Sequence, residues 1–443
     1  MSAFPAIDSA VGRHVLDLVH GCTFDDFILA PQRSVLERRD PSAIDLASRL
    51  SRRLTLKRPI VSANMDTVTR APMAIVQAEE GGIGIIDRGF RPGEIEPQVR
   101  EVEIVKRTQH GVITDPSSIG PAASLDEAAA LMARSRVGTL VVADGALLGL
   151  ITSRDLVRRR RMPFATRDDR GRLRVGAAIG ATGDYLERAA ELVRAGVDVL
   201  VIDIAHGHSV VMERAMAQFR KKFPDVELIA GNVATADGAR FLADCGADGI
   251  KVGIGPGGGC TTRMTTSYGV PQVQALVQCR LAVAGTDVAV IADGGIKRHG
   301  AVLEALLFGG DCVMLGSAFV GTEEAPGEVV HKSVVLPDSQ KAVKVPFKVL
   351  RGMASLEAIR DRLDVEDADK VELEAIGAEG MEISVPARGS ARTVVRDMIK
   401  HVCSSISYGG ASSLGELRAR FWADPERFLI RQSDAARRES YER

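Results

Sequence analysis

The chain has 443 residues, of which 45% are hydrophobic, and this is enough to form a large core and two domains. Lys and Arg number 57 against 58 Asp and Glu, so the charge gives no indication of nucleic-acid binding. No run approaches the roughly 18 apolar residues of a membrane span, and the first residues lack a signal-peptide core. The six cysteines are scattered without a CxxC pair, which is typical of a reducing compartment. We therefore expect a cytoplasmic protein with neither a nucleic-acid nor a membrane partner.

The first part of the chain, residues 1–92, predicts the beginning of an α/β barrel. Residues 59–63 have the apolar character of a short buried strand. Residues 71–80 have the pattern of a helix, and residues 81–86 have that of the next strand. A strand–helix–strand order of this kind predicts strands that pair in parallel.

The pattern changes at about residue 93, and residues 93–172 predict a small inserted α+β segment. A helix is expected over 124–135, and two strands are expected over 138–143 and 147–152. Four consecutive arginines at 158–161 are more typical of a solvated surface or an exit linker than of a phosphate site. A degenerate spacer is the alternative interpretation of the whole segment.

Residues 173–443 resume the alternation and predict the second part of a (β/α)8 TIM barrel. Strands are expected roughly every 20–40 residues, over 176–180, 199–203, 228–232, 249–253, 288–293 and 311–316. In such barrels the active site lies at the carboxyl ends of the strands. Polar residues recur at this position: Asp66, Asp203, Asn232, Cys260 and Asp293.

The C-terminal region departs from the barrel pattern. Residues 354–392 are rich in charge and predict a solvated surface segment. Residues 397–407 predict a final amphipathic helix, and residues 422–443 predict a polar tail.

The most informative stretch is the loop 251–272, in which five glycines surround Pro256 and Cys260 follows. Glycines at this density let the backbone turn sharply and approach a ligand closely. An apolar run leads directly into the loop, as a buried strand would, and this argues against a flexible linker. A cysteine at this position is a candidate nucleophile. The alternative, a buried structural cysteine, suits Cys245, Cys279 and Cys312 better, because they lie in apolar runs.

Two turns after late strands indicate a nucleotide. Asp293 at a strand end could accept hydrogen bonds from both hydroxyls of a ribose. The Gly294-Gly295 and Gly316-Ser317 turns could hold a phosphate with backbone N–H groups. Ordinary βα turns are the alternative, but two in succession favour phosphate. No GxGxxG follows a strand, so a cofactor would not bind as in a Rossmann fold.

Six motifs in chain order carry a family resemblance. They are Phe24-Asp25-Asp26, Asn64-Met65-Asp66-Thr67-Val68, the loop 251–272, Ala292-Asp293-Gly294-Gly295-Ile296, Leu315-Gly316-Ser317 and Arg351-Gly352-Met353. Together they resemble the family of IMP dehydrogenases and GMP reductases over nearly the whole chain. The resemblance implies a purine mononucleotide substrate, a nicotinamide cofactor, K+ and a homotetramer. The inserted segment resembles a single cystathionine-β-synthase (CBS) motif, through which the assembly could become larger.

The resemblance also implies a role for individual residues. Cys260 would attack purine C2, and Thr262 would form a proton relay with Glu379 on a mobile flap at about 354–392. The substrate would be bound by Asp293, Gly294, Gly295, Gly316, Ser317, Gly352, Met353, Ser62 and Met65. The cofactor would be bound by Asp203, Asn232 and Gly253, and K+ by the carbonyls of Gly255, Gly257 and Cys260. The sequence departs from the family pattern at Gly258, where a serine is usual, and at Leu350, where many members have tyrosine.

Within the family, the residues favour a GMP reductase, which converts GMP to IMP and ammonia with NADPH. The alternative is an IMP dehydrogenase, which oxidises IMP to XMP with NAD and needs an Arg-Tyr pair on the flap to activate water. No tyrosine lies between Tyr268 and Tyr408, and Arg362 is followed by Leu363. Asn64 and the segments 298–300 and 404–410 resemble reductases.

Other segments favour the dehydrogenase. The segments that resemble dehydrogenases are residues 61–69, residues 81–86 and the CBS-type insert. A second alternative is a non-catalytic nucleotide-binding protein regulated by the CBS-type segment, but the intact cysteine loop argues against it.

Overall fold

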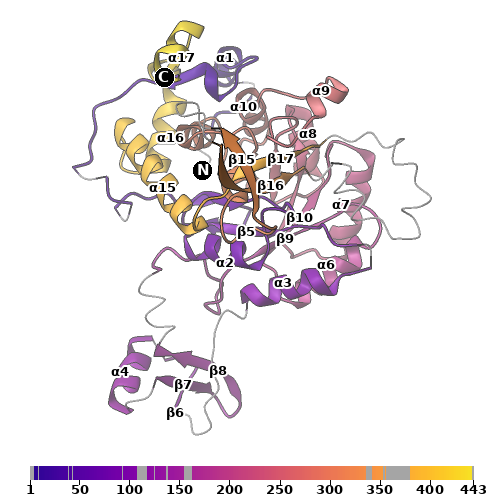
Figure 1. Cartoon of the computed structure of the whole chain (residues 1–443), viewed down its shortest axis with the longest axis vertical. Coiled ribbons are helices and arrows are strands. Elements are labelled where there is room, and N and C mark those ends of the chain that lie inside the picture. Colours follow the sequence, from indigo (N-terminus) through magenta and orange to yellow (C-terminus); the bar gives the residue numbers. More distant parts are fainter. Residues whose placement is uncertain are drawn as a thin grey trace.

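Eight short parallel strands close into a barrel, and helices surround it (Figure 1). The computed structural model describes residues 4–441 except 8, 38, 42, 92, 107–116, 124, 136–137, 154–161, 336–341, 353–354 and 356–379. Around the barrel the strands are β4 (Ile60–Ser62), β5 (Ile83–Ile86), β9 (Gly176–Ile179), β10 (Val199–Asp203), β11 (Leu228–Val233), β12 (Gly249–Val252), β13 (Ala289–Asp293) and β14 (Cys312–Leu315). The predicted (β/α)8 TIM barrel is therefore confirmed.

The helices follow the strands in the order that the barrel requires. They are α2 (Ala71–Glu79), α3 (Glu96–Lys106), α6 (Tyr185–Arg194), α7 (Val210–Lys222), α8 (Ala236–Asp244), α10 (Gln272–Ala282), α11 (His299–Leu307) and α15 (Ala391–Tyr408), with short turns α9 (Thr262–Thr266) and α12 (Ser317–Val320). Side-chain caps begin several of them: the hydroxyls of Ser209, Thr235 and Ser390 accept backbone N–H groups in the first turns of α7, α8 and α15.

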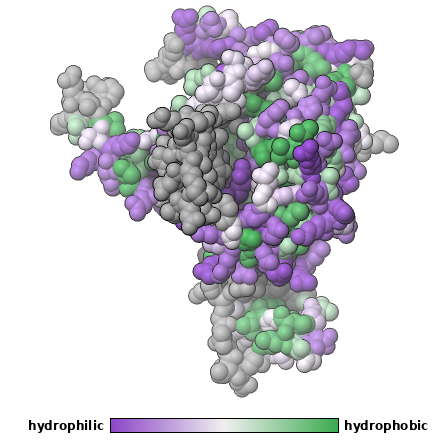
Figure 2. Space-filling view, turned by 90° about the vertical axis from the view of Figure 1, so that its right-hand side faces the viewer, coloured by the Kyte–Doolittle hydropathy of each residue, from purple (hydrophilic) through white to green (hydrophobic). Residues whose placement is uncertain are grey.

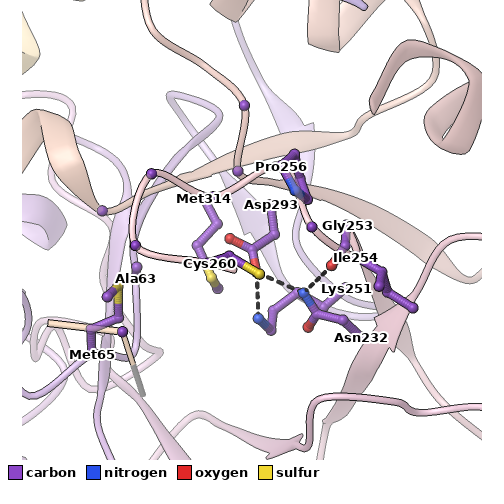
Figure 3. Close-up of a pocket in the computed structure, with 18 of the residues that line it drawn as sticks. Ala63, Met65, Asn232, Lys251, Gly253, Ile254, Pro256, Cys260, Asp293 and Met314 are labelled. Carbon is purple, nitrogen blue, oxygen red and sulfur yellow. Dashed lines mark hydrogen bonds and ion pairs between the residues drawn. The ribbon is translucent and has the colours of Figure 1, made fainter. Parts of the chain in front are cut away.

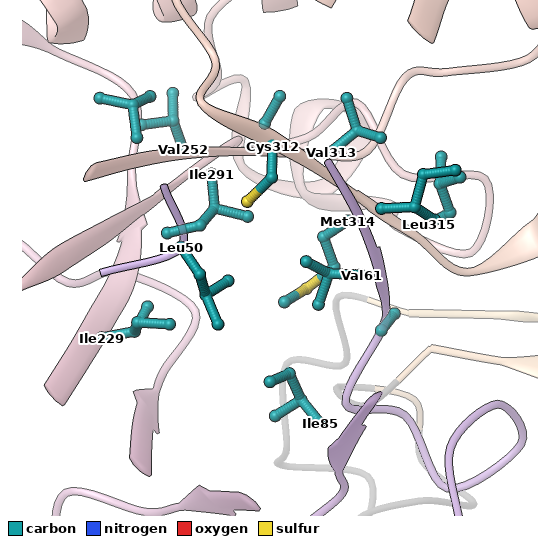
Figure 4. Packing of buried hydrophobic residues seen from close by; sticks show 14 of the residues in the cluster. Leu50, Val61, Ile85, Ile229, Val252, Ile291, Cys312, Val313, Met314 and Leu315 are labelled. Atoms are coloured by element: carbon teal, nitrogen blue, oxygen red, sulfur yellow. The ribbon is translucent and has the colours of Figure 1, made fainter. Parts of the chain in front are cut away.

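The core is aliphatic, and both the strands and the inner faces of the helices contribute to it (Figure 4). The strands read as short apolar runs because they are covered on both faces. At the amino ends of the strands, β2 (Ser48–Arg49) and β3 (Thr55–Leu56) form a small antiparallel pair. Leu50, which follows β2, lies there with Ile229 and Ile291 and closes this end of the barrel (Figure 4). Substrate access is therefore left to the opposite, carboxyl end.

A small separate unit interrupts the connection between α3 and β9 (Figure 1). It contains β6 (Ser117–Ile119), α4 (Leu125–Ser135), β7 (Thr139–Ala143) and β8 (Leu147–Thr152), with a mixed three-stranded sheet. Its own core is formed by Ala128, Met132 and Leu140. Figure 2 shows hydrophobic residues gathered on its surface at the bottom of the view, and Leu147 and Leu148 of β8 are exposed.

The boundaries of this unit are narrower than the predicted segment 93–172. Helix α3 packs against α2 and α6 of the barrel. On the other side, the backbone N–H of Thr166 donates to the carbonyl of Ala78 in α2. Both flanks therefore belong to the barrel, and the predicted helix and strands are confirmed within the unit.

Two expectations for the C-terminal region are wrong. The helix expected over 397–407 is α15, which begins at Ala391 and is not the final helix, because further helices follow it. Residues 422–443 are no polar tail, because α16 (Leu414–Ala423) buries Trp422, whose indole N–H donates to the carbonyl of Leu307. After η3 (Pro425–Arg427), β18 (Leu429–Arg431) pairs antiparallel with β1 (Phe27–Leu29), and α17 (Asp434–Tyr441) follows.

The remaining elements lie at the two ends of the chain and above the barrel. At the N-terminus, α1 (Ala10–Leu18) packs against α10, and η1 (Phe24–Asp26) precedes β1. An antiparallel sheet of β15 (Val330–Val335), β16 (Ala342–Arg351) and β17 (Glu382–Pro386) flanks the predicted flap, of which 354 and 356–379 lie outside the described residues. In the described part of the chain, no helix has the length and apolar character needed to cross a membrane.

Candidate active site

A cavity of about 230 Å³ lies at the carboxyl ends of the barrel strands, where the sequence predicts the active site. Fourteen of the predicted site residues line it: Met65, Asp203, Asn232, Gly253, Gly255, Gly257, Cys260, Thr262, Asp293, Gly294, Gly295, Gly316, Ser317 and Gly352. Gly258 and Leu350, at which the sequence departs from the family pattern, also line the cavity. Residues from separate parts of the chain thus meet at one place.

Three predicted site residues are not among those that line the cavity. Ser62 is fully buried, and its hydroxyl oxygen accepts a hydrogen bond from Thr69 Oγ1 at 2.9 Å. Met353 and Glu379 lie outside the described residues. The structure therefore does not bring Ser62 to the cavity, and the roles of the other two stay predictions.

The cysteine loop is held by backbone pairing with residues on both sides of the flap. Cys260 forms a β-bridge with Gly380. Next to it, the N–H of Met381 donates to the carbonyl of Gly259 at 3.0 Å, and the N–H of Gly352 donates to the carbonyl of Met381 at 3.2 Å. The two described ends of the flap, Gly352 and Gly380, are therefore fixed beside the cysteine.

Cys260 presents its thiol to the cavity. It is half-buried, and its Sγ lies 3.2 Å from Thr262 Oγ1 at the start of α9. Cys279 and Cys312 are instead fully buried, and burial raises the pKa of both thiols. A thiol with a raised pKa is a poor nucleophile, so burial agrees with the structural role expected for Cys279 and Cys312. Cys245 is only half-buried, like Cys260, although burial also raises the pKa of its thiol.

Gly253 permits the close approach between the cysteine loop and β13. Its φ is +154°, and a Cβ atom at this position would lie 2.1 Å from the carbonyl oxygen of Asp293. No side chain fits at that distance. The side chain of Gln272 supports the same junction, because its Nε2 donates to the carbonyls of Val252 and Asp293.

Lys251, which the sequence analysis did not assign to the site, is the central charge of the cavity (Figure 3). Its Nζ donates to Asp293 Oδ2 at 2.5 Å and lies 3.5 Å from Asp203 Oδ2. Burial opposes the charged form, but the carboxylates of Asp203 and Asp293 outweigh it, and the pKa of Lys251 is raised. Lys251 therefore stays charged and holds both carboxylates in place.

A signal for Lys251 is present in the sequence. A lysine in the middle of the apolar strand Gly249-Ile250-Lys251-Val252 has to be buried, and a buried cation requires anionic partners. The strand-end residues Asp203 and Asp293 are the available ones.

Replacement of Lys251 tests this network. We expect Lys251→Met to lower the free energy of unfolding by about 3 kcal/mol, because two partly buried carboxylates would lose their shared cation. The measurement is urea denaturation of the variant and the wild type. Lys221→Met, an exposed lysine of α7, is the control and should change stability by less than about 0.5 kcal/mol. A loss equal to that of the control would contradict the role of Lys251.

Two asparagines complete the polar floor of the cavity. Asn64 Nδ2 donates to Asp203 Oδ2. Asn232 Nδ2 donates to the carbonyl of Gly253 at 2.8 Å and to Asp293 Oδ2 at 2.9 Å (Figure 3). Among the described residues nothing donates to Asn232 Oδ1, which is buried. A buried acceptor without a partner suits a ligand that carries an N–H or O–H donor, such as a carboxamide or a ribose.

The other side of the cavity is tied to the barrel by charged pairs. Arg351 at the end of β16 donates to Asp66 Oδ2, just after Met65. Behind them Arg70 Nε lies 2.7 Å from Asp87 Oδ2. Burial raises the pKa of Asp87 to about 6, although the Arg70 charge acts in the opposite direction.

The predicted K+ ligands are partly consistent with the geometry. Gly257 O already accepts the Cys260 N–H at 3.1 Å, but a carbonyl oxygen has a second lone pair for a cation. Carbonyl oxygens can replace the hydration shell of K+. Three carbonyls are too few for a complete shell, so further ligands would have to come from elsewhere.

The structure places a cysteine loop at the carboxyl end of a (β/α)8 barrel, and comparison with known proteins gives the family. A model described as the IMP dehydrogenase / GMP reductase domain matches residues 21–442. The chain belongs to the IMP dehydrogenase and GMP reductase family. Members of this family are oxidoreductases that act on purine mononucleotides with a nicotinamide cofactor and are generally oligomeric.

Relatives from both branches of the family resemble the chain. An inosine-5'-monophosphate dehydrogenase from Aquifex aeolicus is 37% identical over 90% of the chain and 92% of that protein. One from Streptococcus pyogenes is 38% identical, over 90% and 92%. A crystal structure of a substituted GMP reductase from Trypanosoma brucei in complex with guanosine 5'-monophosphate has a TM-score of 0.81 and 33% identity, over 95% of the chain and 97% of that structure.

Proposed function

We propose that the protein is an NADPH-dependent GMP reductase that converts GMP to IMP and ammonia through a covalent adduct on Cys260. The supporting observation is the Cys260–Thr262 pair, 3.2 Å apart in the cavity, in a chain without any tyrosine between Tyr268 and Tyr408. The pair serves the attack on the base and the departure of the amine. The missing tyrosine removes half of the Arg-Tyr pair that a dehydrogenase would use to activate water.

The reaction begins with the addition of Cys260 Sγ to purine C2. The C–S bond forms, the C2 amine accepts a proton through Thr262 and Glu379, and ammonia leaves with the C–N electron pair. NADPH supplies a hydride to C2. The C–S bond then breaks, its electrons return to the Cys260 sulfur as thiolate, and IMP is released. The whole reaction consumes GMP, NADPH and two protons and yields IMP, NADP+ and ammonium.

The other cavity residues bind the two ligands. Asp293 accepts from the ribose hydroxyls, with Lys251 and Asn232 fixing its carboxylate. The turns at Gly294-Gly295 and Gly316-Ser317 direct N–H groups at the phosphate, and Met65 and Gly352 line the base. Asp203, Asn232 and Gly253 adjoin Asp293 and bind the nicotinamide and its ribose. The solved GMP reductase that binds guanosine 5'-monophosphate supports this arrangement, because it has the same fold over nearly the whole chain.

The second candidate is an IMP dehydrogenase, which the names of the sequence relatives at 37–38% identity favour. One assay separates the two. Purified protein is supplied with GMP and NADPH, and separately with IMP and NAD, while the absorbance of the reduced nicotinamide is followed. We expect sustained NADPH oxidation in the first reaction and no sustained XMP production in the second. The opposite result overturns the proposal, and binding of GMP without turnover in either mixture would indicate the non-catalytic alternative.

We also expect activity to require K+. Carbonyls of Gly255, Gly257 and Cys260 would hold the cysteine loop through the cation, with the remaining ligands from the C-terminal segment, including that of a neighbouring subunit. Replacement of K+ by tetramethylammonium, which is too large for the loop, should lower the rate sharply, and added K+ should restore it. An unchanged rate would exclude the requirement.

Assembly as a homotetramer is part of the proposal, and the CBS-type unit over 117–153 could extend it. Light scattering of the full chain measures the mass in solution. A monomer at assay concentration would contradict the shared K+ site.

A further inference from the structure

Three metal-binding side chains meet outside the cavity, where α11 begins against the middle of α15. His299 is the first residue of α11, and Asp397 and His401 lie one turn apart on α15. Their ligand atoms all lie within 4.8 Å of one another. Asp397 Oδ2 is central, 3.8 Å from Nδ1 of each histidine.

The two helices hold these side chains on a rigid base. The helices pack against each other, and α15 buries Val395, Met398, Ile399 and Val402 along its inner face. Its first turn is capped by Ser390, and Arg392 is bonded to Glu79 and Glu80 of α2. Residues four apart on a helix share one face, so Asp397 and His401 point to the same side. Sites built on helices keep their geometry better than sites on loops.

The hydrogen bonding of His401 suits a metal ligand. Its Nδ1 lies 2.8 Å from the carbonyl oxygen of Asp397. A carbonyl only accepts, so Nδ1 donates, and His401 would bind a metal through Nε2 rather than through the Nδ1 atom that lies 3.8 Å from Asp397 Oδ2. Histidines that bind metals usually donate their other ring N–H in this way.

We propose that His299, Asp397 and His401 form a binding site for a divalent transition metal of the Zn2+, Co2+ and Ni2+ class. Two imidazoles and one carboxylate select such metals over Mg2+ and Ca2+, which prefer all-oxygen ligands. In a tetrahedral site with bonds of about 2.0–2.1 Å, ligand atoms lie about 3.3–3.4 Å apart. The ligand atoms of the three exposed side chains now lie within 4.8 Å of one another, so rotation of these side chains would have to shorten the separations on metal binding. Water fills the remaining coordination positions.

Such a metal would connect the cavity rim to the last helix of the barrel. Helix α11 follows β13, whose end residue Asp293 and the next residues Gly294 and Gly295 line the cavity. A bound ion would fix the start of α11 to α15. The alternative is an ordinary exposed cluster, in which the histidines and Asp397 attract each other weakly and bind no ion.

Isothermal titration of tag-free, full-length protein with Co2+, Ni2+ and Zn2+ tests the proposal. All measurements use a Cys260→Ser background, because the half-buried thiol is itself a soft metal ligand. The expected result is one high-affinity metal per chain, with Mg2+ unable to compete. His299→Gln and His401→Gln should each weaken Co2+ binding by more than about 100-fold. Loss of a residue that only supports a metal ligand lowers affinity by up to about 100-fold, so a larger loss identifies a ligand.

The matched control is His14→Gln, which removes a histidine paired only with Glu426. Its affinity for Co2+ should equal that of the background protein. Circular dichroism of the metal-free variants checks that each one is folded. Equal affinity in the background protein, His299→Gln and His401→Gln overturns the proposal, as does binding of no Co2+ at all. The experiment measures metal affinity and not turnover, so its outcome is independent of the proposed reductase activity.

Discussion

Cys260→Ser should abolish the reduction of GMP while the protein remains folded. A serine hydroxyl is a far weaker nucleophile than a thiol at neutral pH, so addition to purine C2 becomes very slow. We expect kcat to fall by a factor on the order of 10⁴ or more, as for loss of the nucleophile in other covalent enzymes. The measurement is NADPH oxidation with saturating GMP, together with intact-protein mass spectrometry of a quenched reaction. The wild type should show an adduct mass that the variant lacks.

Cys279→Ser is the control for this prediction. Cys279 is fully buried in α10, and its Sγ lies 3.4 Å from the carbonyl of Thr235. A serine can make the same contact, so turnover should stay near the wild-type value. Activity retained by Cys260→Ser would remove the covalent mechanism and the proposal that depends on it.

Glu379→Gln should block release of ammonia without blocking hydride transfer. General acid catalysis typically contributes about 10²–10⁴-fold, so kcat for GMP should fall by that amount. Hydride transfer needs no proton from Glu379. A single turnover of IMP and NADP+, which forms NADPH and the covalent adduct in reverse, should therefore change much less. The split between the two measurements identifies a proton-transfer role, since a disturbed fold would reduce both rates together.

Glu382→Gln is the matched control, because Glu382 is an exposed carboxylate of β17 only three residues further along. It should leave both rates unchanged. The structure supplies one reason to expect an effect at 379: the next residue, Gly380, is paired with Cys260. An equal loss in both reactions of Glu379→Gln would contradict the relay with Thr262.

The barrel could be predicted because its strands are local signals. Each strand is a short apolar run that ends in a polar residue, and pairing of neighbours in chain order follows from the parallel rule. The cysteine loop could also be predicted, because its glycines, its proline and Cys260 lie close together over 253–260. Its position in the cavity then follows from the barrel.

The errors concern pairings between distant parts of the chain. Strand β18 is only three residues long and is stabilised by β1, about 400 positions earlier, so periodicity could not reveal it. Trp422 was assigned to a tail because the residues around it are charged, but its partners are Leu307 of α11 and Phe4 near the N-terminus, both far away in the sequence. Lys251 lies within the expected strand 249–253, but its partners Asp203 and Asp293 are on other strands, so the apolar run alone did not indicate its role.

The position of the small unit has a consequence for the history of the chain. Lys106 lies at the end of α3, just before the unit, and Asp168 lies in the segment that follows the unit. The Nζ of Lys106 is 3.0 Å from Asp168 Oδ2. The same Nζ bonds Asp198, so the entry and exit are joined on the barrel surface without help from the unit itself. The chain between Lys106 and Asp168 is therefore a loop whose ends are held together on the barrel. Doubling the length of such a loop costs only about 0.6 kcal/mol of chain entropy. Insertion, loss or exchange of a folded module at this point therefore leaves the catalytic scaffold nearly as stable as before. Natural recombination at this point could therefore exchange the folded unit while the barrel and its cavity stay the same.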